Sequence, residues 1–264
     1  MRRRCFTLVE LLVVIAVIVL LAALLLPALR SSRQRANALL CSSNIKQLTA
    51  ALFMYEADNQ AFPYGFLSSF TPPPGGFPGN RAYDGIGWWW FNYTSDFSGR
   101  NRGKKTTLWC PSRLIRDPEF DHVLCGNYGV NRSICKSPGG AQGNREEFFG
   151  TPLRGSDIPH PGRTLLIVDS GYSIISWWHA TDVPPAALRD TVIEDAAYVP
   201  GLDINKDKKL WPGQEQDAID GRHPNKTVNV GFVDGHIDRA KANDLFVERI
   251  DDVYSNRTPL WSPK

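Results

Sequence analysis

An uninterrupted apolar segment near the amino terminus constrains this chain more than any other feature. Every residue from Leu11 to Leu29 is apolar, and counted from Phe6 the segment reaches the roughly 20 residues that a helix needs to cross a bilayer. A secretory signal has a shorter apolar centre, about 7–15 residues, followed by a small-residue cleavage site. Here the run continues past Ala22 and Ala23 to Pro27 and into helix-forming sequence. It therefore predicts a membrane-spanning helix.

Glu10 is an acidic residue inside this apolar segment. A carboxylate in the middle of a membrane helix costs about 2.5–3.5 kcal/mol on insertion scales, so a group of this kind is a functional candidate that needs a partner. If the chain is cut between Cys5 and Phe6, the new α-amine of Phe6 lies four residues before Glu10. We expect such an amine to be the partner of the carboxylate.

The basic leader, the Phe-Thr-Leu-Val-Glu sequence and the apolar helix resemble the signature of type IV prepilins and type II secretion pseudopilins. The resemblance implies that a prepilin peptidase removes residues 1–5, that Phe6 is methylated, and that Glu10 pairs with the amine of a neighbouring pseudopilin subunit. It also implies a single-pass protein of the inner membrane, with a cytoplasmic amino terminus and a periplasmic domain after Leu29. The family usually has Gly before the cleaved bond, where this chain has Cys5.

The remainder of the 264-residue chain has the composition of a globular domain. It holds most of the eight Trp and thirteen Phe, and the formal net charge of the chain is only +3. There is no basic cluster of the kind that nucleic-acid binding requires. We predict a leader at 1–5, a transmembrane helix at 6–29, an amphipathic continuation at 30–60, and a globular domain at 61–264.

The helix is predicted to continue well beyond the membrane. Five apolar residues recur at spacings of four, three, four and three, which places them on one helix face: Cys41, Ile45, Leu48, Leu52 and Tyr55. We expect one helix from Phe6 to about Asn59, with its second half packed on the globular domain. Pro27 either kinks this helix or is tolerated near the membrane edge.

The carboxy-terminal half predicts strands. Residues 164–169 form an apolar run, and residues 227–233 alternate apolar and polar side chains, as in a sheet with one covered face. Asp234 and Gly235 then form a hairpin turn dipeptide, and a return strand starts at His236. Residues 172–178 are a further strand candidate, and 240–247 a short helix. The predicted fold class is α+β and pilin-like, with a long helix packed on a small antiparallel sheet that carries long loops.

A second resemblance narrows the family. The chain is similar to a pseudopilin-like group with a helix cysteine, a later Cys-Pro and a carboxy-terminal His…Asp-Gly processing-associated motif. The matching residues are Cys41, then Cys110 with Pro111, then His223, Asp234 and Gly235. The spacing from His223 to Asp234 is one residue longer than in the family. We expect His223 to bond the turn carboxylate or backbone and so to stabilise the hairpin.

The cysteines are predicted to be located in an oxidising compartment. If Cys5 leaves with the leader, four cysteines remain, and they permit three pairings. We favour Cys41 with Cys110, because Cys41 lies on the inward helix face, and this leaves Cys125 and Cys135 as a local pair. That all four are separate buried thiols stays open.

Catalytic and cofactor motifs are weak. A metal-dependent enzyme could use five residues that lack the spacing of a specific metal site: Asp169, His179, His223, Asp234 and His236. No nucleophile elbow or phosphate loop is present, so no enzyme is predicted. Asp203, Asn205 and Asp207 alternate like the start of a calcium loop, but Lys208 and Gln214 replace the expected Gly and Glu. Calcium remains an alternative to an ordinary loop, and no other cofactor is expected.

Two functions fit the sequence. The first is a cleaved and methylated pseudopilin-like subunit that assembles in a type II secretion or type IV pilus-like machine. The alternative is an anchored extracytoplasmic protein that binds glycans or another partner through its aromatic cluster, Trp88, Trp89 and Trp90. Three consecutive tryptophans cannot all face one surface of a strand.

Overall fold

A computed structural model describes residues 7–73, 76–77, 86–94, 106–139, 146–182, 197–251, 253–255 and 259–262. Its dominant element is the helix α1, Leu8–Asn59, whose 52 residues span about 80 Å. Pro27 lies inside α1 without ending it, and the helix stops where Gln60 takes a left-handed conformation with φ of 61°. The predicted continuous helix is therefore confirmed.

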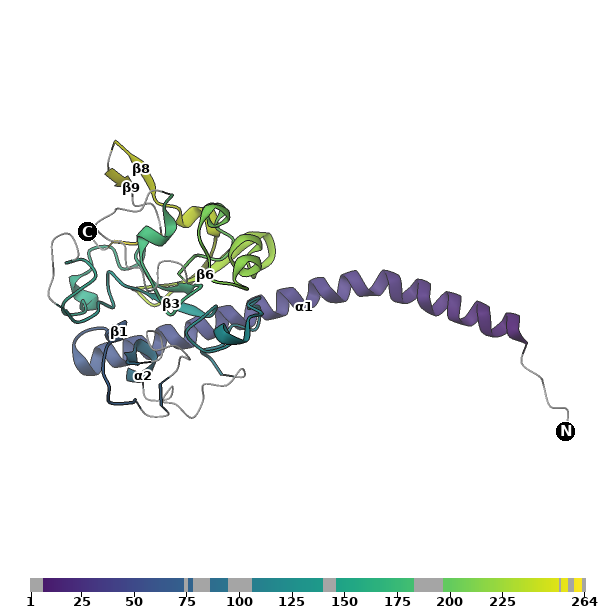
Figure 1. Ribbon diagram of the computed structural model, residues 1–264, viewed down its shortest axis with the longest axis horizontal. Helices are drawn as coiled ribbons and strands as arrows, with labels where there is room; N and C mark the ends of the chain where they lie inside the picture. Colours follow the sequence, from purple (N-terminus) through teal and green to yellow (C-terminus); the bar gives the residue numbers. More distant parts are fainter. Residues whose placement is uncertain are drawn as a thin grey trace.

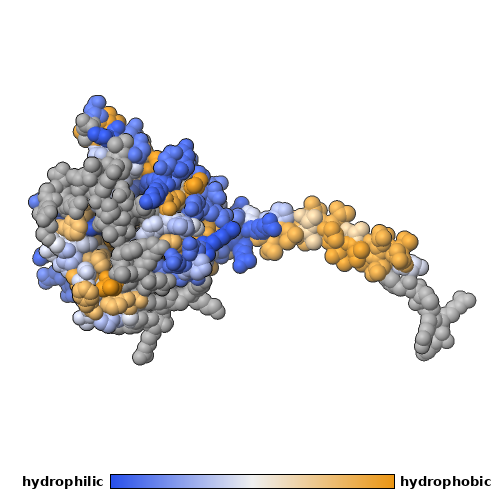
Figure 2. Space-filling model, in the orientation of Figure 1, coloured by the Kyte–Doolittle hydropathy of each residue, from blue (hydrophilic) through white to orange (hydrophobic). Residues whose placement is uncertain are grey.

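The two halves of α1 have different surroundings. Figure 1 shows the second half lying against the sheet while the first half extends away from the domain. The large apolar side chains between Leu8 and Leu29 are 48–78% exposed, whereas four of the five predicted face residues are 0% exposed: Cys41, Ile45, Leu48 and Leu52. Tyr55 is only half-buried, against the ring of Tyr93. In Figure 2 the projecting half forms a continuous apolar rod.

The main sheet has five strands in the order β5-β3-β4-β6-β7. They are β3 Tyr128–Asn131, β4 Leu165–Asp169, β5 Ile174–Ile175, β6 Thr227–Phe232 and β7 Ile237–Lys241. Neighbours are antiparallel except β3 and β5, which are parallel. The predicted strand at 164–169 and the hairpin around Asp234 are thus present. The candidate at 172–178 shrinks to β5.

Short elements complete the described chain. Two small antiparallel sheets pair β1 Phe66–Leu67 with β2 Trp88–Trp89, and β8 Glu248–Ile250 with β9 Val253–Ser255. The helix α2, Trp90–Tyr93, follows β2. The 3-10 turns are Pro118–Phe120, Gly155–Asp157, Trp177–Ala180, Asp203–Asp207, Pro224–Lys226 and Ala242–Leu245, and a π turn spans Gln216–Asp220. The helix expected at 240–247 is only the last of these 3-10 turns.

Both faces of the sheet are covered, which differs from the expected single covered face. The apolar row of β6, Val228, Val230 and Phe232, packs with Leu245 and Trp261 on the side away from α1. The opposite side of β6 presents Asn229 and Gly231 to the helix. The expectation failed because the segments that follow β5 and β7 fold back over the second face, which strand periodicity cannot reveal.

Gly231 allows α1 to approach the sheet closely. A Cβ atom on Gly231 would lie 2.4 Å from Thr49 Oγ1 and 2.7 Å from Ile167 Cγ2. Because any side chain here would push the helix away, the interface requires glycine. The helix and the sheet therefore form one packed unit.

The tryptophan cluster belongs mainly to the core. Trp89 and Trp90 are buried, and Trp90 Nε1 donates to the carbonyl of Ser173 at 2.9 Å. Trp88 is half-buried, and its Nε1 donates to the carbonyl of Thr71. The three side chains do face different surroundings, as expected. Two of the three rings are not available to stack on a sugar.

Candidate functional site

The start of α1 is the first candidate site. Glu10 N donates to Thr7 Oγ1 at 3.3 Å, and Thr7 N donates to Glu10 Oε2 at 2.9 Å. These reciprocal bonds form a capping box. Sequence reasoning missed Thr7, although the pattern Thr-x-x-Glu before an apolar run is the signal for such a box. Cys5 and Phe6, the expected cleavage and methylation sites, lie outside the described residues.

This end of α1 combines a carboxylate with exposed apolar surface. The Glu10 carboxylate lies beside the backbone N–H of Thr7, the residue that follows the expected new amino terminus. Within the described chain, α1 is the one helix long and apolar enough to cross a membrane, and none of the described residues covers that segment. An apolar surface of this size requires lipid or another helix to cover it.

A second candidate site is a buried polar cluster between α1 and the sheet. Asp169 ends β4, and its Oδ2 accepts from Asn229 N at 2.7 Å and lies 3.1 Å from His223 Nε2. A ring nitrogen of His223 lies within 4.8 Å of the sulfurs of Cys41 and Cys110, and all these groups are buried. The fold thus brings together residues from the helix, a loop, β4 and the segment before β6.

The acid and the base in this cluster hold each other charged. Burial opposes ionisation of Asp169, but the charge of His223 and its hydrogen bonds outweigh burial and lower the pKa of the carboxyl. Burial also opposes protonation of His223, yet the Asp169 charge prevails and raises the pKa of the imidazole to about 9. At neutral pH the cluster therefore contains an imidazolium–carboxylate pair.

Stability is expected to fall as pH rises through about 9. The pKa of His223 is about 9 in the fold and near the ordinary histidine value of 6.5 when unfolded, so its contribution is complete below pH 6.5 and lost through pH 9. The lowered pKa of Asp169 acts oppositely, because its contribution is lost on acidification. Unfolding of the detergent-solubilised chain in denaturant should show up to about 3 kcal/mol less stability at high pH.

The control for this pH dependence is His223→Gln. In this variant the free energy of unfolding should decrease much less as the pH rises. The charged or titratable groups that face His223 are Asp169, Cys110, Cys41 and, through Asp169, Arg222. A variant that retains the full decrease would show that a group other than His223 titrates.

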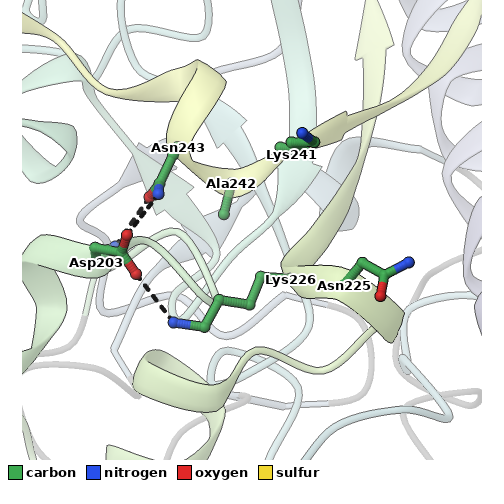
Figure 3. Close-up of a pocket in the computed structure, with 6 residues that line it drawn as sticks. All are labelled: Asp203, Asn225, Lys226, Lys241, Ala242 and Asn243. Carbon is green, nitrogen blue, oxygen red and sulfur yellow. Dashed lines mark hydrogen bonds and ion pairs between the residues drawn. The ribbon is translucent and has the colours of Figure 1, made fainter.

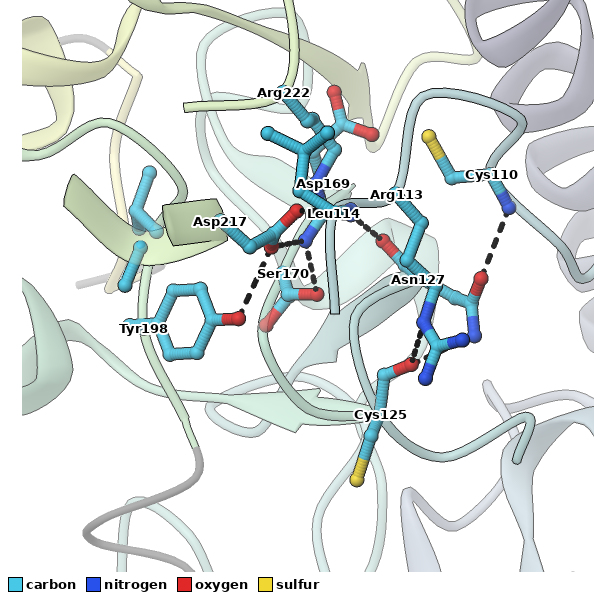
Figure 4. A network of polar contacts seen from close by, with 12 residues as sticks. Cys110, Arg113, Leu114, Cys125, Asn127, Asp169, Ser170, Tyr198, Asp217 and Arg222 are labelled. Atoms are coloured by element: carbon cyan, nitrogen blue, oxygen red, sulfur yellow. Dashed lines mark hydrogen bonds and ion pairs between the residues drawn. The ribbon is translucent and has the colours of Figure 1, made fainter. Parts of the chain in front are cut away.

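A buried ion pair adjoins this cluster. Arg222 and Asp217 lie 2.5 Å apart with side chains that are 0% exposed, and Tyr198 Oη donates to Asp217 Oδ2 at 3.0 Å. Arg222 also donates to the carbonyls of Asn127 and Ser170. Figure 4 shows these groups converging, with the Asn127 side chain accepting from the backbone of Cys110. Arg222 therefore ties the Cys110 loop to the strand ends.

The His…Asp-Gly residues do not meet one another. His223 pairs with Asp169 instead of with the turn, whereas Asp234 Oδ1 accepts from His236 N at 3.0 Å on the β6–β7 turn. Gly235 has a φ of 91°, which glycine adopts readily. The bond expected between His223 and the turn carboxylate is not formed, because β6 separates the two ends of the motif by its whole length.

The expected calcium ligands do not converge either. Asp203 Oδ1 accepts from Lys226 Nζ at 3.0 Å, and Asn205 points inward, where its amide donates to the Val199 and Ala218 carbonyls. Asp203 lines an open depression of about 500 Å³ together with Lys226 and Lys241, and Figure 3 shows the Lys226 side chain reaching the Asp203 carboxylate. A lysine ammonium thus lies where a cation would bind.

The histidines and acids of the imagined metal-dependent enzyme occupy separate places. Asp169 and His223 are buried together, Asp234 and His236 lie on the exposed turn, and His179 Nε2 accepts from Trp178 Nε1. Within the described residues, the one group close enough to share a metal ion is Cys41, Cys110 and His223. Its sulfurs are 2.6 Å apart, whereas zinc–sulfur bonds of about 2.3 Å place tetrahedral ligands roughly 3.8 Å apart. The arrangement does not fit zinc.

All four described cysteines are buried, and none of the four forms a disulfide bond. The predicted partners Cys41 and Cys110 are in direct contact. The predicted local pair is not formed: Cys125 Sγ lies 3.9 Å from His122 Nε2, and Cys135 is buried in the main apolar core. Burial raises the pKa of the Cys135 thiol, which makes this residue an unreactive core side chain.

Two family models match the chain. The model described as "Prokaryotic N-terminal methylation motif" matches residues 1–26, and the model described as "Protein of unknown function (DUF1559)" matches residues 30–96. The amino-terminal segment therefore carries the methylation motif of prepilins, and the chain is similar to a type II secretion core protein. The methylation motif covers the leader and most of the apolar segment, so this pseudopilin-like chain has the helix start that its sequence led us to expect.

Known relatives agree with this assignment. Type II secretion system core protein G of Dickeya chrysanthemi is 28% identical over 153 residues, which cover 54% of this chain and 97% of that protein. Core protein G of Pseudomonas aeruginosa is 41% identical over 58 residues, or 22% of this chain and 41% of the relative. The Type IV wide pilus major component PilA4 of Thermus thermophilus is 42% identical over 57 residues, or 22% and 44%.

The pseudopilin-like chain spans less than half the length of the Pseudomonas and Thermus proteins that it matches. No solved structure matches it. The similarity therefore characterises mainly the amino-terminal helix of this chain.

Proposed function

We propose that this chain is a structural subunit of a type II secretion or type IV pilus-like machine. A prepilin peptidase removes residues 1–5 and Phe6 is methylated. The mature helix then packs with other pseudopilins. The proposal rests on one observation: the apolar half of α1 is exposed, and it begins at a capping box that contains the Glu10 carboxylate. The methylation motif match at residues 1–26 supports it.

The physical basis is the change of surroundings that assembly brings. Before assembly, the apolar half of α1 lies in the inner membrane, with the amino terminus cytoplasmic and the sheet domain periplasmic. In a filament, the same surface is covered by the helices of neighbouring subunits. The Glu10 carboxylate is costly in an apolar environment unless it is paired, and the new amine of a neighbouring Phe6 supplies a charge of opposite sign.

The role is structural and not enzymatic. Its relatives are secretion and pilus components, and the polar groups that the fold brings together are sealed between α1 and the sheet. A substrate could not reach them without separating the helix from the domain. The remaining function of the domain is to present an outer surface to other subunits.

Intact mass of the protein extracted from membranes tests this proposal. We expect a species that begins at Phe6 and carries one added methyl group. A peptidase-deficient strain is the control and should yield the chain with residues 1–5 retained. Retention of residues 1–5 in both strains would contradict the proposal and would favour an anchored binding protein.

A further inference from the structure

Cys41 and Cys110 join the two parts of the molecule. Cys41 is on the buried face of α1, Cys110 is in the loop before β3, and their sulfurs are 2.6 Å apart although the residues are separated by 69 positions. Two cysteines whose sulfurs already touch can be linked with little backbone movement. The Cys110 backbone is also fixed, because its N–H donates to Asn127 Oδ1 at 2.9 Å.

His223 is positioned against this cysteine pair. Its Nε2 is bound to Asp169, and its side chain is 0% exposed. Its Nδ1 is buried and has no hydrogen-bond partner in the described part of the chain. One ring nitrogen lies within 4.8 Å of both sulfurs. The imidazole therefore connects the carboxylate on one side with the sulfurs on the other.

We propose that Cys41 and Cys110 form a reversible disulfide that cross-links α1 to the sheet domain, and that His223, held by Asp169, is a positioning residue that sets the stability of this disulfide. The occurrence of the bond in cells rests on the proposed function, because that function places both cysteines in the oxidising periplasm.

The oxidant is a protein or small-molecule disulfide. The Cys110 thiolate attacks one sulfur of the oxidant, forms a mixed disulfide and releases one thiolate. The Cys41 thiolate then attacks Cys110 Sγ and releases the second thiolate. The two thiols of the chain thereby lose two electrons and two protons, and the oxidant gains both as two thiols. Because the sulfurs are buried, this exchange takes place before α1 docks fully or when it opens.

The positive charge on His223 favours the reduced form of the pair. Burial raises the pKa of Cys110. Burial also opposes ionisation of Cys41, but the hydrogen bond with Cys110 outweighs it and lowers the pKa of Cys41. Cys41 is therefore the sulfur of the pair that ionises more readily, and it lies within 4.8 Å of a ring nitrogen of His223. A cation beside a thiolate stabilises the product of reduction, so the disulfide becomes easier to reduce. Removing this charge should therefore make the disulfide more stable.

A cross-link at this place has a mechanical consequence. The membrane half of α1 carries the forces of assembly, whereas the outer domain is held to α1 by packing around Ile45, Leu48 and Thr49. A covalent bond at Cys41 connects the helix to the domain about one turn from the end of this interface nearest the membrane, where Ala38 is buried and Asn37 donates to the carbonyl of Pro111. Pulling on the helix then cannot separate it from the sheet.

Redox titration of the purified full chain in detergent tests the proposal. The chain is equilibrated in glutathione buffers of graded ratio, quenched with N-ethylmaleimide, and digested. We expect a peptide that joins Cys41 to Cys110, with Cys125 and Cys135 alkylated. His223→Gln should shift the equilibrium constant at least about tenfold toward the disulfide, which equals about 30 mV.

Matched variants distinguish the effect of the His223 charge from a general disturbance of the fold. His122→Gln removes a buried histidine that is 3.9 Å from a different cysteine, Cys125, and should leave the potential unchanged. Asp169→Asn removes the group that holds His223 charged and should shift the potential in the direction of His223→Gln. It replaces His223→Gln if that variant does not fold, as judged by near-ultraviolet circular dichroism.

Three results would overturn the cross-link: alkylation of both Cys41 and Cys110 at every glutathione ratio, pairing of Cys41 with a cysteine other than Cys110, or stoichiometric zinc in the purified protein. Equal potentials in the wild type and the folded charge-removing variants would overturn the role of His223. Because the titration uses purified protein, its failure is distinct from failure of the topology, which the mass of the amino terminus measures.

Discussion

Replacing Glu10 by glutamine is expected to reduce incorporation into filaments at least about tenfold while leaving α1 intact. Glutamine can form the same capping box with Thr7, so the helix still begins at Leu8. The substitution removes only the negative charge that pairs with a neighbouring amine, and an interaction worth about 1.4 kcal/mol per subunit contact already gives a factor of ten. The measurement is the fraction of tagged protein in sheared filaments.

The matched control is Asp58→Asn, which neutralises an exposed acid near the other end of the same helix. It should assemble like the wild type. Thr7→Val tests the cap separately, because it removes the side-chain half of the box and keeps the charge of Glu10. Undiminished assembly of the glutamine variant would contradict the pairing on which the proposed function depends.

Replacing Arg222 by methionine should destabilise the outer domain by about 3–5 kcal/mol. The change leaves the Asp217 carboxylate buried without its cation, and uncompensated buried charges have costs of this size. Two backbone carbonyls, those of Asn127 and Ser170, also lose a donor. The measurement is denaturant unfolding of the full chain in detergent, followed by tryptophan fluorescence.

Lys226→Met is the control for this variant, since Lys226 pairs with Asp203 at the surface, where both side chains are about half exposed. Exposed pairs contribute at most about 1 kcal/mol. The double variant Arg222→Met with Asp217→Leu should recover part of the lost stability, because it leaves no unpaired charge. A loss below about 1 kcal/mol for Arg222→Met would contradict the account of this network.

The two sites differ in how far they could be predicted. The start of α1 depends on neighbours in sequence, so a helix that begins just before Glu10 could be predicted from the order of residues along the chain, while cleavage at Cys5 and methylation of Phe6 stay predictions. Thr7 was overlooked although its capping signal is local. No such local signal marks the buried network of Arg222, Asp217 and Tyr198. Its members come from separate loops, and their positions along the chain follow no periodic rule.

The strands show the same division. Alternation in β6 and the Asp-Gly turn after it predicted a hairpin, and β6 and β7 form one. The same alternation led to the expectation of a single covered face. Both faces of β6 are buried because Leu202, Leu245 and Trp261 pack beneath it, and those residues lie at least ten positions from the strand. Such contacts depend on the path of the chain after the strand, and local sequence patterns do not specify that path.

The amino-acid sequence by itself determined the long helix, its exposed apolar half, the inward face through Cys41 and Leu52, and the resemblance of its amino-terminal segment to prepilins, since each of these rests on periodicity or on adjacent residues. Only the tertiary structure decided that His223 pairs with Asp169, 54 residues away, and that both lie beside Cys110. The reason is that burial makes distant polar groups satisfy one another, and which groups meet depends on how the helix docks on the sheet.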